Sequence, residues 1–200
     1  MRAAMKPGVR RLRLLRTTVI AARLWLGLFF KIRVTGLENI PDSSPFVLLP
    51  KHQRWEDIPL LGISVRRPLY YVAKVELFHP APVGAFLSSV GGIPLNRERP
   101  IESRRHLRQV VEHLRAGEGI VIFPEGTYRP NCMGPGHPGL IRMVSARTSP
   151  PFIPVGIRYT PGFRTGVAIR VGKPVRAVTA RETAAFLEKI MGEIGRLSGL

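Results

Sequence analysis

The amino-acid sequence predicts an α/β fold in which helices flank a central mixed sheet. Three observations indicate this fold. Short apolar or alternating runs recur along the chain, and segments with helical periodicity separate them. The 200 residues are 44% hydrophobic, which is enough for one domain with a sizeable core.

The expected elements follow one another along the chain. The predicted strands are short apolar segments at residues 46–50, 69–73, 119–123, 151–157 and 167–172. The predicted helices between and after them cover residues 54–64, 101–116, 137–147 and 180–197. Pro154 lies inside one strand run, so we expect a sheet edge, a strand start or a bulge there.

Charge is the unusual feature of the composition. The chain has 31 Lys and Arg residues against 13 Asp and Glu, a formal net charge of +18. Such a surface attracts the phosphates of nucleic acids, lipid headgroups or phosphorylated substrates. The charges are scattered and no recognised nucleic-acid motif accompanies them, which argues against a nucleic-acid-binding module. The single cysteine excludes an internal disulfide and a thiolate metal cluster.

The amino-terminal residues 9–34 narrow the choice of polyanion. Read as one helix, this segment spreads apolar and aromatic side chains over most of its circumference. One basic stripe remains, which consists of Arg13, Arg16, Arg23 and Lys31. The segment could lie in a headgroup layer with its aromatic side chains down. The alternative is a helix that packs on the domain and exposes an arginine face to water.

A membrane crossing and a signal peptide are both excluded for this segment. Its uninterrupted apolar run, residues 24–30, is too short, because a crossing needs about 20 residues. Arg23 also interrupts any signal-peptide core. We therefore expect residues 1–35 to form a membrane-surface amphipathic segment and residues 36–200 to form the main domain.

The stretch KHQRWEDIPL, residues 51–60, carries the first candidate site. His52 and Asp57 would lie about 140° apart on a regular helix, so they could not share a face of one. They can meet if His52 lies in the loop after a strand and Asp57 in the first turn of the next helix. A carboxylate that holds one imidazole nitrogen leaves the other as a base for a hydroxyl. Taken alone, such a pair is more often a loop contact without catalytic function.

Three further motifs follow this pair: GGIPLNR (91–97), FPEGT (123–127) and IPVGI (153–157). In this order, the set resembles the four motif blocks of the glycerolipid acyltransferase family, which includes the lysophosphatidic acid acyltransferases. The segment KVEL, residues 74–77, resembles one that the family places between its first two blocks. The resemblance covers more than half of the chain, and FPEGT in this position is a specific signal.

The resemblance implies an O-acyltransferase. His52 matches the family's general base and Asp57 its orienting carboxylate, so the acceptor hydroxyl would lose its proton to His52 while it attacks an acyl thioester. This mechanism needs no covalent acyl-enzyme, no metal and no cofactor. The implied acceptor is 1-acylglycerol-3-phosphate; glycerol-3-phosphate or another lysolipid, or a non-catalytic lipid-binding relative, are the alternatives. The donor could be acyl-CoA or acyl carrier protein.

The resemblance also implies the substrate-binding residues. Arg97 matches the arginine assigned to the acceptor's phosphate. The third block shapes the acceptor site through Glu125, Gly126 and Thr127, although Glu125 could instead brace its loop. A fixed cation, a glycine and a hydroxyl donor do suit a phosphate monoester.

Two further cations are candidates for substrate binding. Arg129 would give a second phosphate contact, and Lys74 belongs to the KVEL segment. For each of these, the alternative is a solvated charge.

The chain departs from the family pattern at three positions. Lys51 stands where the family often has asparagine, and Arg54 where it usually has a small hydroxyl residue. Tyr128 separates Thr127 from Arg129, whereas the family usually places arginine directly after the threonine. These departures leave the His–Asp chemistry intact and the acceptor headgroup open. Arg54 adds a cation that could bind phosphate or the donor's phosphopantetheine arm.

A family that works on membranes also fits the basic amino-terminal segment. We expect a peripheral or monotopic protein on the cytoplasmic face of a membrane. Its expected partners are a lysophospholipid acceptor, an acyl thioester donor and an anionic membrane surface, with no nucleic acid.

Overall fold

The computed structural model describes residues 11–96, 100–176 and 183–200. Its strands are β1 (Phe30–Thr35), β2 (Phe46–Pro50), β3 (Leu69–Lys74), β4 (Gly92–Leu95), β5 (Gly119–Val121), β6 (Phe152–Thr160) and β7 (Thr165–Val171). Its α-helices are α1 (Leu12–Phe29), α2 (Asp57–Ser64), α3 (Ala81–Ser89), α4 (Pro100–Arg115), α5 (Pro138–Ser145) and α6 (Thr183–Ser198). Two short 3-10 helices are η1 (Leu37–Asn39) and η2 (Val75–Phe78).

The strands form one sheet in the order β1-β7-β6-β2-β5-β3-β4. Neighbouring strands are parallel except β6 and β7, which form an antiparallel pair. The predicted α/β fold with a mixed sheet is therefore confirmed. The carboxyl ends of β2, β5 and β3 meet at one edge of the sheet, which we call the carboxyl edge. Ligands bind at this edge in open parallel sheets.

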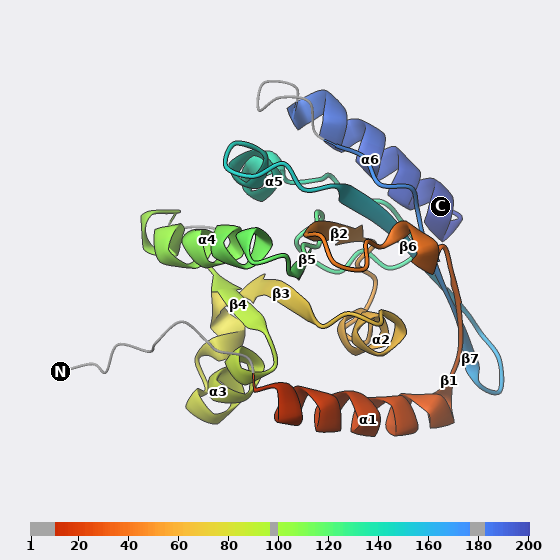
Figure 1. The fold of residues 1–200 in the computed structure, drawn as a ribbon. Coiled ribbons are helices and arrows are strands. Elements are labelled where there is room, and N and C mark those ends of the chain that lie inside the picture. Colours follow the sequence, from red (N-terminus) through yellow and green to blue (C-terminus); the bar gives the residue numbers. More distant parts are fainter. Residues whose placement is uncertain (1–10, 97–99, 177–182) are drawn as a thin grey trace.

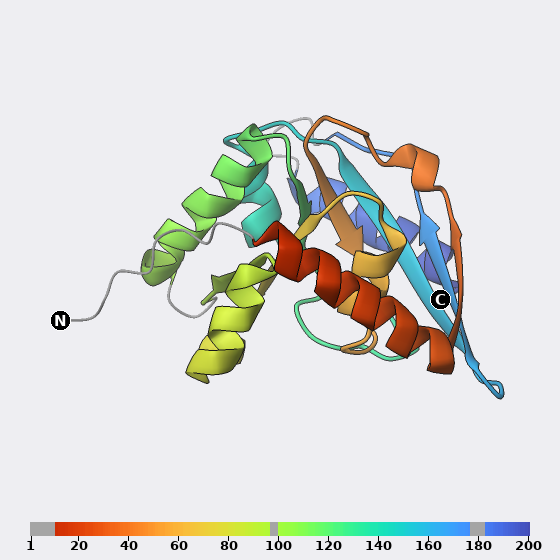
Figure 2. The same cartoon turned by 60° about the horizontal axis from the view of Figure 1, so that its bottom comes forward.

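Helices cover both faces of the sheet. Figures 1 and 2 show α1 and α2 on one face and α4, α5 and α6 on the other. Each face has its own buried apolar cluster. Leu26 of α1 and Leu60 and Leu61 of α2 belong to the first cluster, and Val110 of α4 and Ile190 of α6 belong to the second.

Most predicted elements form where the sequence places them. The strand at residues 46–50 has the predicted bounds, and the ends of the others differ by a few residues. Pro154 is the third residue of β6, and pairing with β7 begins only at Val155. The proline therefore lies inside a central strand, paired with Leu49 of β2, and neither at a sheet edge nor at the strand start.

Helix α3 was not predicted from the sequence, because Pro82 and Gly84 are both poor helix formers. Proline is tolerated in the first turn, where its missing N–H has no helical partner. Gly84 is required by packing, since a Cβ at this position would lie 2.3 Å from the carbonyl oxygen of Phe78. The sequence shows the helix breakers but not this close approach.

The amino-terminal segment is not one helix, and the prediction is wrong at this point. Helix α1 ends at Phe29, and the following residues alternate between inward and outward side chains as strand β1. Lys31 therefore lies on a strand and not on a helical basic stripe. Arg23 is fixed against α2, because its guanidinium donates to the carbonyl oxygen of Ile63 at 2.7 Å.

Helix α1 exposes most of its large apolar side chains, whereas a helix that packs on a core usually buries them. It buries Leu26 and leaves six large apolar side chains exposed: Leu12, Ile20, Leu24, Trp25, Leu28 and Phe29. Such a surface is unusual for a helix in contact with water only. Within the part of the chain that the structure describes, no helix has the length and apolar character needed to cross a membrane.

Candidate active site

The candidate active site lies at the carboxyl edge of the sheet. His52 follows β2, and Asp57 is the first residue of α2, as the sequence predicts. The FPEGT turn follows β5, the neighbour of β2, and Lys74 ends β3, the neighbour of β5. The order of the strands thus gathers three segments that are far apart in the sequence.

The histidine and the aspartate are in contact. The Nδ1 atom of His52 lies 3.1 Å from Oδ2 of Asp57. The same oxygen accepts hydrogen bonds from the backbone N–H groups of Gln53, at 2.6 Å, and Arg54, at 2.8 Å. Asp57 is fully buried, so one carboxylate fixes both the imidazole and the loop that carries it. The ring nitrogen that remains for a substrate hydroxyl is Nε2.

Aromatic rings surround the imidazole of His52. The ring stacks on Phe123 with a centroid separation of 3.8 Å, and Tyr128 lies 4.4 Å away at a tilt. Both aromatic residues flank the Glu-Gly-Thr turn, so the third motif supplies the walls of the histidine's pocket. Burial, followed by the charges of Asp57 and Glu56, raises the pKa of the Tyr128 phenol.

Tyr159 is a site residue that the sequence did not reveal. Its hydroxyl donates to Oδ1 of Asp57 at 2.6 Å. Burial is the main cause that raises the pKa of Tyr159, and the charge and hydrogen bond of Asp57 add to it, so the phenol stays a donor. The guanidinium carbon of Arg54 lies 4.7 Å from the centre of the Tyr159 ring, a cation–π contact.

Lys51 and Glu125 form a buried ion pair beside the histidine. The Lys51 ammonium lies 2.7 and 2.9 Å from the two oxygens of Glu125. Glu125 also accepts from the backbone N–H groups of His52, at 3.1 Å, and Gly134, at 2.7 Å. Because its carboxylate contacts three protein donors, the geometry favours a bracing function for Glu125. The departure from the family pattern at Lys51 was the available signal for this pair.

A cavity of about 660 Å³ opens beside His52. Its lining includes four of the predicted substrate-binding residues: Lys74, Glu125, Gly126 and Thr127. Gly126 has a φ of 69°, a left-handed conformation that favours glycine and turns the chain after Glu125. Lys74 and Thr127 are exposed, so an ammonium and a hydroxyl are accessible from the cavity. Ile58, Val72 and Leu95 give the cavity an apolar part.

Phosphate contacts were predicted for Arg129 and Arg97, and the structure describes only the first of these residues. Arg129 contributes its backbone to the site, because its N–H donates to the carbonyl oxygen of His52 at 2.8 Å and its carbonyl accepts from Lys51 at 2.7 Å. Its side chain lies near Gly134 and, among the described residues, is not part of the cavity lining. Arg97 lies outside the described residues, so its phosphate contact stays a prediction.

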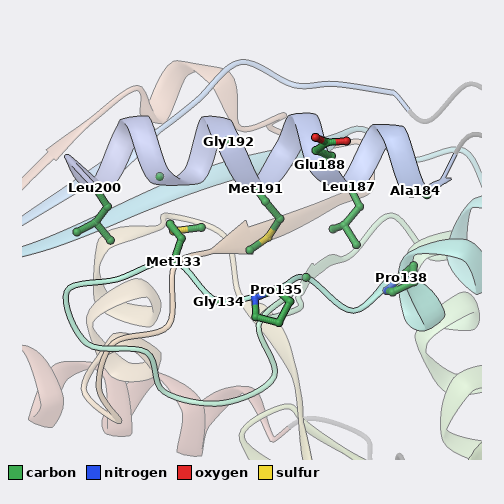
Figure 3. Close-up of a pocket in the computed structure, with 12 residues that line it drawn as sticks. Met133, Gly134, Pro135, Pro138, Ala184, Leu187, Glu188, Met191, Gly192 and Leu200 are labelled. Carbon is green, nitrogen blue, oxygen red and sulfur yellow. The ribbon is translucent and has the colours of Figure 1, made fainter.

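A second hollow, of about 650 Å³, lies between the loop of residues 133–138 and α6. Figure 3 shows its apolar side chains, among them Met133, Leu187 and Met191. It contains none of the predicted site residues. Its edge at Gly134 is nevertheless tied to the active site, through the hydrogen bond to Glu125.

The fold and the site together define the class of protein: an α/β protein with a buried His–Asp pair at the carboxyl edge of the parallel strands in a mixed sheet. A model of the Acyltransferase family matches residues 31–158, and the chain belongs to this family. The resemblance inferred from the motifs is thereby confirmed.

Individual relatives are similar over part of the chain. A 1-acyl-sn-glycerol-3-phosphate acyltransferase of Bacillus subtilis is 34% identical over 108 residues, 54% of this chain and 53% of that protein. A lyso-ornithine lipid O-acyltransferase of Pseudomonas aeruginosa is 35% identical over 106 residues, 53% of this chain and 39% of that protein. The chain thus spans about half the length of these relatives, or less.

A solved structure supports the fold. The crystal structure of PlsC, the 1-acyl-sn-glycerophosphate acyltransferase of Thermotoga maritima, matches 93% of this chain and 80% of its own chain with a TM-score of 0.72. The sequence identity is 24%, so this comparison bears on the arrangement of helices and strands alone.

Proposed function

We propose that this chain is an O-acyltransferase that works on a membrane surface. It moves a fatty acyl group from an acyl thioester, either acyl-CoA or acyl carrier protein, to the hydroxyl of a lysophospholipid. The proposed acceptor is 1-acylglycerol-3-phosphate, and the product is phosphatidate. The observation that carries the proposal is the contact of His52 Nδ1 with Asp57 at 3.1 Å beside a cavity of about 660 Å³.

The chemistry needs one base and its carboxylate. With Nδ1–H donating to Asp57, Nε2 of His52 removes the proton of the acceptor hydroxyl while that oxygen attacks the thioester carbonyl carbon. The carbon–sulfur bond breaks, and the departing thiolate takes the proton back from the imidazolium. The buried carboxylate of Asp57 stabilises the imidazolium between these two steps.

Lys74, which lines the cavity, and Arg97, which follows β4 in the sequence, would bind the acceptor's phosphate. Arg97 follows β4 by two residues, and β4 runs parallel to β3, at whose carboxyl end Lys74 lines the cavity. We assign the phosphate to Arg97, with Lys74 and the Thr127 hydroxyl as further contacts. The exposed apolar side chains of α1 support a peripheral or monotopic position on a membrane surface.

A second acceptor has one observation in its favour, since a relative carries the name lyso-ornithine lipid O-acyltransferase. Ornithine is an amino acid with its own amine, so a headgroup of this kind gains less from cations at the cavity than a phosphate monoester does. The cations therefore favour the phosphorylated acceptor.

A product analysis tests the proposed function. The purified protein is incubated with either thioester donor and a mixture of 1-acylglycerol-3-phosphate, glycerol-3-phosphate and lyso-ornithine lipid, and the lipids are identified by mass spectrometry. We expect phosphatidate, and at most about a hundredth as much from the His52→Ala protein. Acylated ornithine lipid as the main product would overturn the choice of acceptor, and full activity of a folded His52→Ala protein would overturn the mechanism.

A further inference from the structure

We propose that Tyr128 is a further catalytic residue, whose phenol hydroxyl donates a hydrogen bond to the oxyanion that forms when the thioester carbonyl is attacked. The proposal rests on the proposed function, because it concerns the same transfer of an acyl group from a thioester. It gives a role to a position where the chain departs from the family pattern, since Tyr128 follows Thr127 directly, where arginine is usual.

Attack on a thioester creates a negative charge that the His52–Asp57 pair does not neutralise. As the acceptor oxygen bonds to the carbonyl carbon, the π electrons of the carbonyl move onto its oxygen, which becomes an oxyanion. These electrons return when the carbonyl re-forms and the carbon–sulfur bond breaks. A hydrogen-bond donor fixed beside that oxygen stabilises the charge where it develops, which is often the largest single contribution to the rate. The mechanism therefore needs a donor close to Nε2 of His52.

Tyr128 lies beside the proposed base. Its ring centroid is 4.4 Å from that of His52, at an interplanar angle of 58°, so the two rings are in contact. Tyr128 also lines the cavity of about 660 Å³ together with His52 and Thr127. The phenol oxygen is one bond beyond a ring that contacts the imidazole, and Tyr128 is 48% exposed. A thioester carbonyl in the cavity can therefore meet this hydroxyl while its carbon faces the base.

The hydroxyl of Tyr128 is available as a donor. Within the part of the chain that the structure describes, it has no protein partner. The hydroxyls of two other tyrosines near the site are already bonded, that of Tyr159 to Asp57 and that of Tyr71 to the carbonyl oxygen of Ile58 at 3.1 Å. Burial, followed by the charges of two nearby carboxylates, raises the pKa of the Tyr128 phenol. The phenol therefore keeps its proton at neutral pH and does not repel an oxyanion.

Four other polar side chains of the cavity suit this charge less well. Glu76 and Glu125 are carboxylates, which accept hydrogen bonds and would repel an oxyanion. Lys74 and Thr127 carry the proposed contacts to the acceptor's phosphate. Tyr128 combines a neutral donor with a direct contact to the base.

Thioester cleavage with two different acceptors tests the proposal. The full chain is assayed with acyl-CoA and 1-acylglycerol-3-phosphate, and separately with acyl-CoA in excess glycerol, which has hydroxyls but neither a phosphate nor an acyl chain. Release of free thiol measures both reactions, including transfer to water. Tyr128→Phe removes the hydroxyl and keeps the ring against His52. We expect kcat to fall about a hundredfold with either acceptor, because both reactions place the oxyanion on the same carbonyl oxygen.

Tyr71→Phe is the matched control. Tyr71 is a tyrosine at the same cavity, but its hydroxyl is already bonded to the carbonyl oxygen of Ile58. This variant should keep kcat nearly unchanged with both acceptors. The circular dichroism of each variant is compared with that of the wild type, so that a loss of kcat in Tyr128→Phe reports the hydroxyl and not the fold.

Two results would overturn the proposal. A loss confined to the lysolipid reaction, with a raised KM for the acceptor, would place the phenol at the acceptor headgroup. An unchanged kcat in both reactions would show that the oxyanion has another donor, and a hundredfold loss in His137→Gln would identify it as His137, which also lines the cavity.

The same assay separates this proposal from the proposed function. A wild-type protein that cleaves the thioester in glycerol but acylates no lysolipid would contradict the proposed function. A hundredfold slower thioester cleavage by its Tyr128→Phe variant would still support Tyr128 as the donor. Phosphatidate formation at the wild-type rate by Tyr128→Phe would contradict only the role of Tyr128.

Discussion

The hydroxyl of Tyr159 lies 2.6 Å from Oδ1 of Asp57, whereas His52 contacts the other oxygen of the same carboxylate. Asp57 thus has a phenol on one side and the imidazole of His52 on the other. Tyr159 is a positioning residue, because it acts on the histidine only through Asp57.

Tyr159→Phe removes this hydroxyl and keeps the ring under Arg54. We expect kcat to fall about ten- to a hundredfold, since hydrogen bonds to charged groups contribute about 1.5–3 kcal/mol, while KM for both substrates changes little. Steady-state kinetics with each substrate varied in turn checks the split. A variant with raised KM and normal kcat would instead place Tyr159 in substrate binding.

The proposed base, His52, and its carboxylate partner, Asp57, supply a second prediction. His52→Ala should remove general-base assistance and lower kcat by about 10²–10⁴-fold. Asp57→Asn should have a smaller effect on kcat, because Asp57 orients the base and does not react. The measurement is acyl transfer by proteins whose circular dichroism matches the wild type. If Asp57→Asn were as inactive as His52→Ala, the carboxylate would do more than orient.

Because Lys51 and Glu125 form a buried ion pair, we expect their substitutions to be strongly coupled in their effects on the free energy of unfolding. Lys51→Gln and Glu125→Gln each leave a partner buried without its counter-charge, which costs about 3–5 kcal/mol in comparable pairs. The double variant should lose clearly less than the sum of the two single losses. Urea denaturation of all four proteins measures this coupling. As a control, Arg196→Gln breaks the exposed pair with Glu193 and should barely move the unfolding midpoint.

The acceptor's phosphate supplies a kinetic prediction. Arg97→Ala should lower kcat/KM for the acceptor roughly ten- to a hundredfold through a higher KM, because a charge-assisted contact is lost. Arg129→Ala should show a smaller change of the same kind, since its side chain lies near Gly134 and outside the cavity lining. A selective rise in the KM of the acyl donor would assign Arg97 to the donor site.

The contribution of the α1 arginines to membrane binding can be measured by itself. Arg13→Gln with Arg16→Gln should weaken binding to anionic vesicles by about 1 kcal/mol per arginine. Added salt should reduce the difference between this variant and the wild type, because the screening length is about 10 Å at 0.1 M. Equal binding of the two proteins to anionic vesicles at low salt would contradict a headgroup contact of these arginines.

The sequence predicted the sheet, most helices and the His52–Asp57 contact, because these depend on local periodicity and on short spacings. The prediction is wrong at the end of α1, because the residues from Phe29 onward fit a helical wheel as well as a strand. Pairing of Phe30–Thr35 with β7 decides between them, and that partner lies far along the chain. Local patterns carry no information about such a partner.

The same reason explains the missed members of the site. Tyr159 meets Asp57 across 102 positions of sequence, and Lys51 meets Glu125 across 74. Both contacts arise only when β6, β2 and β5 lie side by side. The alternation of β6 does place Ile157 and Tyr159 on one face, but it does not show which side chain of α2 lies opposite.

Helix α1 passes into strand β1 without an intervening linker: Phe29 ends the helix and Phe30 begins the strand. Hydrogen bonds to β7 hold that strand along its whole length. A bilayer that binds α1 would consequently fix the tilt of the entire sheet relative to the membrane plane. The domain could not rotate about a flexible linker, because none separates α1 from the sheet. The protein would meet its lipid acceptor by diffusing in the plane of the leaflet, in one orientation, so that encounter becomes a two-dimensional search.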